Sequence, residues 1–165
     1  MSRSNRIKPL IQRREDALRM GGGDKVARHH ARGKLDARTR IDRLCDQGTF
    51  REIGTISGVA SYDKEGSFEH LSPANFIFGR AKIDGRDVVI TADDFTVRGG
   101  AADASIREKV VQAEKMAWSL RLPLIRLIDG TGGSVRTIET MGRTYVPANP
   151  AWDSVIRNLE TVPVI

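Results

Sequence analysis

The sequence has 165 residues, which is enough for one domain with its own hydrophobic core. Hydrophobic residues make up 39% and charged residues 29%, and no apolar run approaches the roughly 18–20 residues that span a bilayer. Residues 1–7 also lack the apolar stretch of a signal peptide. These features exclude a membrane-spanning protein and lead us to expect a cytoplasmic location.

The net charge of +6 is concentrated near the N-terminus, where residues 1–40 carry 12 Lys or Arg and 4 Asp or Glu. A basic arm can indicate nucleic-acid binding. This arm has no Phe, Tyr or Trp for base stacking, and its basic residues are spread along helical patterns. We therefore expect no nucleic acid, but a solvated helix face or one that meets an acidic partner or a phosphate-bearing ligand.

The first part of the chain, residues 1–48, is predicted to be helical. Apolar residues recur at helical spacing over residues 7–18, and Ser4 or Asn5 is the expected N-cap of this first helix. The glycines at 21–23 end it. Asp24 is then the expected cap of a short second helix.

A third helix is predicted to start at an Asp36 N-cap and to run to Asp46, with Gly48 just past its end. The only cysteine, Cys45, excludes an internal disulfide and a zinc site with several thiolates. It shares a helical face with Ile41, so we expect it in the core.

The pattern then changes to strands. Residues 50–56 are strand-like, whereas residues 61–75 are polar and typical of a loop. Residues 76–83 and 87–91 are predicted strands, and the Asp-Gly pair at 84–85 between them indicates a hairpin, because its turn needs positive φ.

The rest of the second part, residues 49–165, alternates helix and strand. A long helix is expected over residues 104–120, followed by a strand at 123–128, a helix at 151–159 and a strand at 162–165. This order favours an α/β architecture. The buried stripe of the long helix is predicted to be Ile106, Val110, Ala113, Ala117 and Leu120. The two tryptophans, Trp118 and Trp152, are expected to be packing residues.

A glycine-rich loop, residues 129–134, follows the predicted strand at the place where α/β proteins bind ligands. It matches neither the P-loop nor the dinucleotide-binding pattern. Its backbone N–H groups are sterically free to face an oxygen, as in an oxyanion hole, but a plain tight turn fits the residues equally well.

A second candidate loop covers residues 93–100, in which Arg98 offers a guanidinium to a phosphate. Asp93 and Asp94 do not predict a metal site, because neighbouring carboxylates in a strand point to opposite faces. The adjacent His29 and His30 have no other ligands at metal-binding spacing.

Several motifs stand in one order along the chain. They are Gly21-Gly-Gly-Asp-Lys25, His30-Ala-Arg-Gly-Lys-Leu-Asp-Ala-Arg-Thr-Arg-Ile41, Gly79-Arg-Ala-Lys-Ile-Asp-Gly-Arg-Asp-Val88, Asp94-Phe-Thr-Val-Arg-Gly-Gly100 and the segment from Pro123 to Gly133. Together they resemble the N-terminal part of the carboxyltransferase (beta) subunit of biotin-dependent acyl-CoA carboxylases, a family with propionyl-, methylcrotonyl- and acetyl-CoA members.

The resemblance implies a crotonase-like ββα spiral, incomplete here and preceded by the N-terminal helices. It implies transfer of a carboxyl group from carboxybiotin to the α-carbon of an acyl-CoA. Biotin would be carried by a partner, so a biotin carboxylase and biotin carrier subunit are expected, together with a homo-oligomer of the full-length protein. In such a mechanism backbone N–H groups hold the thioester enolate.

The resemblance also implies site residues. The expected backbone oxyanion donors are Gly132, Gly133 and Ser134. The expected CoA-binding residues are Phe95, Arg98, Gly99 and Gly100. No metal is expected. A second donor would come from a glycine pair after the strand at 162–165, so we expect this chain alone to be inactive, and poorly soluble because that strand is an edge.

The loop departs from the family pattern, since Gly130-Thr-Gly-Gly-Ser-Val-Arg136 replaces Ser-Gly-Gly-Ala-Arg. The acyl group therefore stays open. Two alternative functions also stay open: a subunit of a biotin-dependent acyl-CoA decarboxylase, and a non-catalytic basic assembly module.

Overall fold

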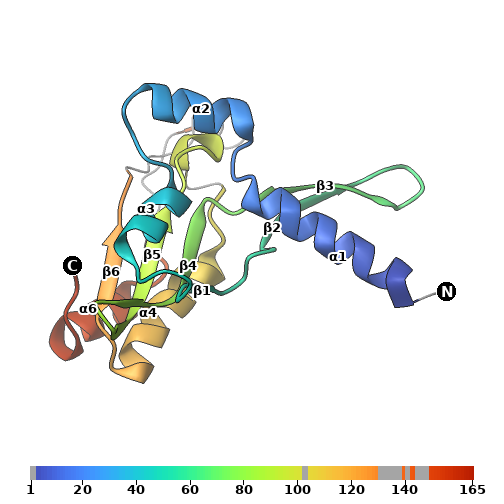
Figure 1. Ribbon diagram of the computed structural model, residues 1–165. Coiled ribbons are helices and arrows are strands. Elements are labelled where there is room, and N and C mark those ends of the chain that lie inside the picture. The colour runs from blue at the N-terminus through green and yellow to red at the C-terminus, as the bar shows by residue number, and fades with distance from the viewer. Residues whose placement is uncertain (1–2, 102–103, 130–138, 140–141, 144–148) are drawn as a thin grey trace.

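A computed structural model describes residues 3–101, 104–129, 139, 142–143 and 149–165. Its centre is a four-stranded sheet in the order β1-β4-β5-β6 (Figure 1). The strands are β1 (Arg51–Glu52), β4 (Phe76–Ile83), β5 (Arg86–Asp93) and β6 (Leu124–Leu127). β5 and β6 are parallel and the other pairs are antiparallel. A parallel pair whose connection contains a helix confirms the predicted α/β architecture.

The hairpin between β4 and β5 turns where the sequence predicted it. Asp84 and Gly85 both have positive φ, at 49° and 75°, as this kind of two-residue turn requires. The Asp46 carboxylate accepts hydrogen bonds from both backbone N–H groups, at 2.9 and 2.8 Å. The turn is thereby fixed to the segment that follows helix α3.

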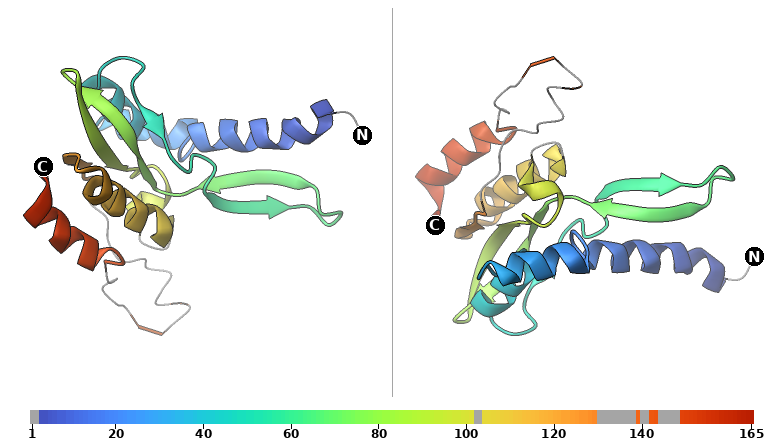
Figure 2. Two further views of the ribbon diagram at one scale, coloured as in Figure 1. Left: turned by 90° about the horizontal axis from the view of Figure 1, so that it is seen from below. Right: turned by 90° about the horizontal axis from the view of Figure 1, so that it is seen from above.

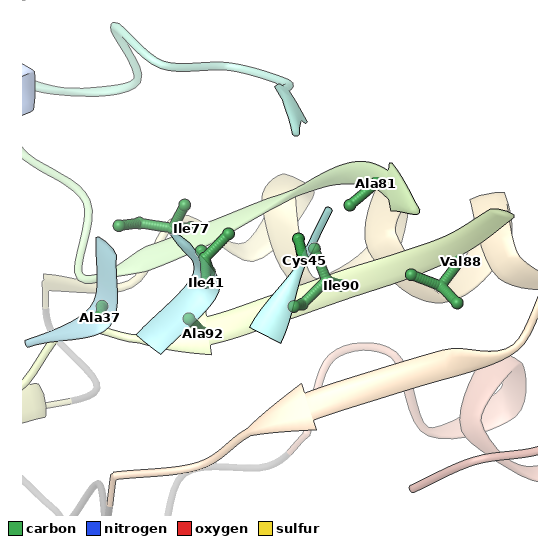
Figure 3. Packing of buried hydrophobic residues seen from close by; sticks show 8 residues of the cluster. All are labelled: Ala37, Ile41, Cys45, Ile77, Ala81, Val88, Ile90 and Ala92. Carbon is green, nitrogen blue, oxygen red and sulfur yellow. The ribbon is translucent and has the colours of Figure 1, made fainter. Parts of the chain in front are cut away.

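Helices cover both faces of the sheet, because β5 is apolar on both sides. Val88, Ile90 and Ala92 point to one face, where they pack under helix α3 (Ala37–Leu44) with Ile41 (Figure 3). Cys45 belongs to the same cluster and is buried, as predicted.

Val89 points to the opposite face and packs against Ala117 of helix α4 (Arg107–Leu120). Helix α6 (Trp152–Thr161) lies against α4 (Figure 2). Beyond α6 the chain returns to β6, where Leu124 and Val164 form a parallel bridge. The strand predicted at the C-terminal end is therefore present as a single bridge.

An arm projects from this body (Figures 1 and 2). It consists of helix α1 (Arg3–Leu18) and a hairpin of β2 (Gly58–Tyr62) and β3 (Phe68–Pro73). The buried carboxylate of Asp16 accepts a hydrogen bond from Leu71 N at 3.1 Å and joins the two.

The prediction of a loop at 61–75 was wrong. Only Leu71 of the two hairpin strands is buried, and the strands carry no regular alternation of apolar and polar residues. The predicted strand at 50–56 was too long, since only β1 pairs.

Two predicted helix caps were also wrong. Helix α1 begins at Arg3, ahead of Ser4 and Asn5. Helix α2 (Gly23–Ala31) begins before Asp24, which lies in its first turn. An acidic residue is favourable there because of the helix dipole, so Asp24 does mark the start of α2, although it is not the N-cap.

The Asp36 cap is confirmed, since its carboxylate accepts a hydrogen bond from Thr39 N at 2.9 Å. Helix α3 ends at Leu44, before the predicted Asp46, and Gly48 takes a positive φ of 71° in the turn beyond.

The predicted stripe of α4 is partly wrong. Ala113 and Ala117 are buried, but Leu120 is exposed, and the polar Lys109 and Glu114 are buried in its place. The predicted packing of Trp152 was wrong too, because its side chain is 61% exposed, whereas the partly exposed Trp118 ring lies 5.6 Å from the Arg157 guanidinium of α6. Within the described residues no helix is long and apolar enough to cross a membrane.

Candidate functional site

Helix α2 crosses the turn that follows β5 (Figure 1). A basic pocket lies between them. Its volume is about 160 Å³. Helix α2 and the residue that follows it contribute Lys25, Arg28, His29 and Arg32, and the turn contributes Phe95, Thr96 and Gly99. Residues 25, 28, 29 and 32 have i, i+3, i+4, i+7 spacing, so one side of the helix faces the turn.

Close backbone approach holds α2 on this turn. Gly21 N donates a hydrogen bond to Thr96 Oγ1 at 3.0 Å. A Cβ atom on Gly21 would overlap the carbonyl of Thr96. Only glycine therefore permits the approach that forms the pocket.

The turn after β5 is held by the Asp94 side chain, which is almost completely buried. Its carboxylate accepts hydrogen bonds from Thr96 N at 2.9 Å and from Thr96 Oγ1 at 2.6 Å. Burial raises the pKa of Asp94, although the Thr96 hydrogen bonds oppose the rise. Asp94 is thus a structural group of this turn.

His29 connects the pocket to the end of β6. Its ring is only 5% exposed and stacks on Phe95, with 5.8 Å between the ring centres. His29 Nε2 lies 3.1 Å from Asp129 Oδ2, and Lys34 Nζ lies 2.8 Å from Asp129 Oδ1. Asp129 therefore receives two basic side chains from the N-terminal segment.

The ends of β5 and β6 meet at the same edge of the sheet, because these strands are parallel. Asp129 N lies 3.4 Å from Asp93 Oδ2, and Arg40 Nη2 donates to Ile128 O at 3.1 Å. Burial raises the pKa of Asp93, and the nearby Arg40 partly offsets the rise. Asp129 and the residue before it are thus held by contacts from α2, α3 and β5.

Two of the CoA-binding residues predicted from the resemblance, Phe95 and Gly99, line the pocket. Arg98 is exposed and Gly100 is buried, and neither belongs to the lining. The predicted oxyanion donors Gly132, Gly133 and Ser134 lie outside the described residues.

The sequence predicted a basic helix face, but it did not single out the four residues of α2 and its C-terminal end that line the pocket. Their i, i+3, i+4, i+7 spacing was the available signal. What the spacing does not reveal is the partner of that face, which lies about 70 residues further along the chain. Chemically, guanidinium, ammonium and imidazole groups around a small pocket suit an anion with several oxygens, such as a phosphate.

Comparisons with known proteins identify the family of the chain. The model of the family described as "Carboxyl transferase domain" matches residues 28–156 of this chain. The chain is 36% identical over 144 residues to a propionyl-CoA carboxylase carboxyltransferase subunit of Haloferax mediterranei, covering 86% of this chain and 28% of that protein. It is 34% identical to an acetyl-/propionyl-coenzyme A carboxylase beta5 subunit of Mycobacterium tuberculosis, covering 81% and 24%. The chain thus spans about a quarter of these relatives.

Solved structures show the fold. The chain is similar to the transcarboxylase 12S structure with methylmalonyl-coenzyme A, with a TM-score of 0.67 and 22% sequence identity. The superposition covers 98% of this chain and 29% of the transcarboxylase chain. A single-chain, multi-domain long-chain acyl-CoA carboxylase superposes on 99% of this chain, over 17% of its own chain, with a TM-score of 0.73 and 22% sequence identity. The fold is therefore the crotonase-like α/β fold of carboxyltransferases. Since the family description covers most of its length, the chain belongs to the carboxyl transferase domain family.

Proposed function

We propose that the protein is the carboxyltransferase component of a biotin-dependent acyl-CoA carboxylase, and that the pocket under α2 binds phosphate groups of the acyl-CoA. The observation that carries this proposal is the single basic face of α2 lying against the Phe95–Gly99 turn. Relatives of this chain are carboxyltransferase subunits that act on propionyl- or acetyl-CoA by name.

The pocket residues fit this role. Arg28 and Arg32 each present a planar fork of N–H donors that matches two phosphate oxygens, and Lys25 adds a compact charge. CoA carries a pyrophosphate and a 3′-phosphate, so it brings several anionic oxygens to such a pocket. The uncharged biotin ring system does not fit it, and we assign the pocket no contact with biotin.

The reaction moves a carboxyl group to the α-carbon of the acyl-CoA. Carboxybiotin, carried by a partner protein or domain, supplies that group. The described residues anchor the far end of the acyl-CoA. Gly132, Gly133 and Ser134 remain our candidates for backbone donors to the thioester enolate, because in the sequence they lie three to five residues after Asp129, which His29 contacts.

We extend the proposal to organisation and partners. Residues 1–48 form a basic helical segment and residues 49–165 the first part of the carboxyltransferase domain. A biotin carboxylase and biotin carrier subunit are the proposed partners, and a homo-oligomer is supported by the name of the 12S structure, which describes a hexamer assembly. The proposed location is the cytoplasm.

A second function is favoured by one relative. The chain is 31% identical over 127 residues to the methylmalonyl-CoA decarboxylase subunit alpha of Propionigenium modestum. The two functions share the acyl-CoA site and differ in the direction of carboxyl transfer. Product analysis with the partner subunits separates them: bicarbonate incorporation into acyl-CoA indicates a carboxylase, and CO₂ release from malonyl-type thioesters indicates a decarboxylase.

Calorimetric titration of the chain with CoA, dephospho-CoA and pantetheine tests the phosphate pocket. We expect CoA to bind most tightly and pantetheine least. Arg28→Ala and Arg32→Ala should each weaken CoA binding by roughly tenfold, the usual loss for a charged hydrogen bond. Arg14→Ala, which removes the same charge from exposed α1, is the control and should have little effect. Equal binding of the three ligands would overturn the proposal.

A further inference from the structure

We infer that the groove between helices α4 and α6 binds a nucleoside phosphate. Lys115 and Arg157 receive the phosphate groups, and Glu108 and Asp153 accept hydrogen bonds from the hydroxyl or amino groups of the nucleoside. This α4–α6 groove is separate from the pocket under α2, with which it shares no lining residue. The inference therefore goes beyond the proposed function and does not depend on it.

The groove exists because the two helices lie side by side and run in the same direction (Figure 2). Helix α4 connects the parallel strands β5 and β6, and α6 connects β6 to the parallel bridge at Val164. Their first turns therefore lie at the same end. Residues between 107 and 115 form one wall, and residues between 150 and 157 form the other. The volume of about 520 Å³ is in the usual range for sites that bind small molecules.

The charges are divided along the groove. Glu108 and Asp153 lie in the first turns of α4 and α6. Lys115 follows Glu108 by seven residues and Arg157 follows Asp153 by four, so the cations lie about 10 and 6 Å further along their helices. Val111 contributes apolar surface between the ends. The groove thus has a carboxylate end and a cationic end, and suits an elongated ligand with two different ends.

The cations are available to a ligand. Among the described residues neither Lys115 nor Arg157 has a carboxylate within 4.0 Å. The Arg157 guanidinium lies 5.6 Å from the centre of the Trp118 ring, and this contact restrains the side chain without neutralising its charge. An ammonium and a guanidinium on facing walls suit the oxygens of a phosphate group. The third cation, Arg107, begins α4 at the carboxylate end, and we assign it no ligand group.

The carboxylates decide what the rest of the ligand must be. Glu108 and Asp153 are exposed, and in the described part of the chain neither has an ion pair. They would repel a ligand that consists of phosphate alone. Ionised carboxylates only accept hydrogen bonds, so they suit hydroxyl and amino groups. Acidic side chains bind ribose hydroxyls in this way in dinucleotide sites. A nucleoside phosphate therefore satisfies both ends of the groove, whereas inorganic phosphate or pyrophosphate satisfies one.

Calorimetric titration of the chain with ADP, pyrophosphate and adenosine, without divalent cations, tests the inference. We expect ADP to bind roughly tenfold more tightly than pyrophosphate, and adenosine to bind least. Lys115→Ala and Arg157→Ala should each weaken ADP binding by roughly tenfold, the usual loss for a charged hydrogen bond. Arg43→Ala is the control and should have little effect, because Arg43 is exposed on α3, on the other face of the sheet.

The acidic variants test the carboxylate end. Glu108→Ala and Asp153→Ala each remove an acceptor for the nucleoside and a negative charge near the phosphates. They should therefore weaken ADP binding by severalfold and strengthen pyrophosphate binding. A groove that attracts phosphate by charge alone predicts tighter binding of both ligands. Tighter ADP binding in these variants would overturn the nucleoside assignment.

CoA also carries an adenosine with phosphates, so the source of the nucleotide needs its own titration. The Arg28→Ala, Arg32→Ala double variant should bind ADP as the wild type does, because neither residue lines the α4–α6 groove. Displacement of ADP by CoA from this variant would identify the nucleotide end of an acyl-CoA as the occupant. Retention of ADP would identify a free nucleotide. Both results support a nucleoside phosphate site.

Other outcomes contradict the inference and leave the pocket under α2 standing. They are the absence of ADP binding to the folded wild type, pyrophosphate binding as tight as that of ADP, and unchanged ADP binding in Lys115→Ala and Arg157→Ala. The substituted side chains are exposed, so each variant is expected to fold. Circular dichroism of each variant checks that a loss of binding is not a loss of the fold.

Discussion

Lys109 is a buried cation in the first turn of α4. Its side chain is 6% exposed, and Nζ lies 6.0 Å from the centre of the Phe78 ring. Burial lowers the pKa of Lys109 to about 8, with Arg38 lowering it further and Glu52 opposing the change. Within the described part of the chain its ammonium has no ion pair within 4.0 Å. The folded state therefore gives up this proton more easily than the unfolded state.

This predicts a rise in stability with pH. Between about pH 8 and 10.5 the unfolded chain still holds the Lys109 proton and the folded chain has lost it, so unfolding free energy increases over that window. The full increase is at most about 3 kcal/mol. Denaturant unfolding at several pH values measures it. Lys109→Met should remove the rise and add roughly 1–3 kcal/mol at neutral pH.

Lys115→Met is the matched control, because Lys115 is exposed on the same helix. It should leave both the stability and its pH dependence nearly unchanged. A pH dependence that is identical in Lys109→Met and wild type would contradict the assignment of the rise to Lys109.

At the residue scale the sequence could not have predicted Lys109 or Glu114 as buried. A helical pattern marks apolar residues, and it correctly marked Ala113 and Ala117. Glu114 is buried because Arg126 and Asn158 donate hydrogen bonds to it, each at 2.7 Å. These partners lie on other elements, and periodicity within one helix carries no information about them.

At the element scale the start of α3 depends on Asp36. Besides Thr39 N, its carboxylate accepts from Thr39 Oγ1 at 2.6 Å and lies 2.8 Å from His30 Nε2. Burial raises the pKa of Asp36, but these hydrogen bonds and the charge of His30 bring it below the ordinary 3.8. The lowered pKa means that the ionised group stabilises the fold above pH 3.8 and that this contribution is lost as the pH falls through the folded value.

Asp36→Ala should therefore destabilise the protein by roughly 1–2 kcal/mol at neutral pH, as loss of an N-cap does. The difference from wild type should shrink in acid. Urea unfolding at neutral and acidic pH gives both numbers. Asp42→Ala removes an exposed carboxylate from the same helix and should change stability far less. Equal effects of the two substitutions would refute the capping role.

The junction between α1 and α2 sets the pocket, and Gly21 is its contact point. Gly21→Ala should push the junction off the Thr96 carbonyl, lower the melting temperature and weaken CoA binding together. Gly23→Ala is the control, because a Cβ atom there meets no heavy atom within 4 Å and Gly23 begins a helix. That control should be neutral or slightly stabilising. A Gly21→Ala protein with wild-type binding would show that this contact does not position the pocket.

Elements were predictable where their signals were local. The Asp36 cap and the Asp84-Gly85 turn each depend on residues within three positions, and both are present. The β2–β3 hairpin was missed because its stability comes from α1 rather than from its own pattern. The turn at Phe95–Gly99 lies in the loop that the sequence predicted at residues 93–100, but its contact with α2 is visible only in the fold.

At the scale of the whole molecule, the outer face of α6 is strongly apolar and exposed. Trp152 is 61% exposed and Leu159 is 66% exposed, with Ile156 between them on the same side of the helix. The i, i+4, i+7 spacing makes this a continuous stripe. Such patches cause association in water. The sequence predicted the helix, but periodicity alone did not show that its apolar side would lack a cover among the described residues.

The chain on its own should therefore self-associate as its concentration increases. Sedimentation velocity over a range of concentrations measures this, and Ile156→Glu together with Leu159→Glu should shift the distribution toward monomer without lowering the melting temperature. Val155→Glu is the matched control: Val155 is buried against the body, so the same charge should unfold the protein rather than disperse it. The prediction would be contradicted by a wild-type chain that stays monomeric at all concentrations and melts cooperatively. In that case the exposed apolar area of the α6 stripe would be too small to drive association.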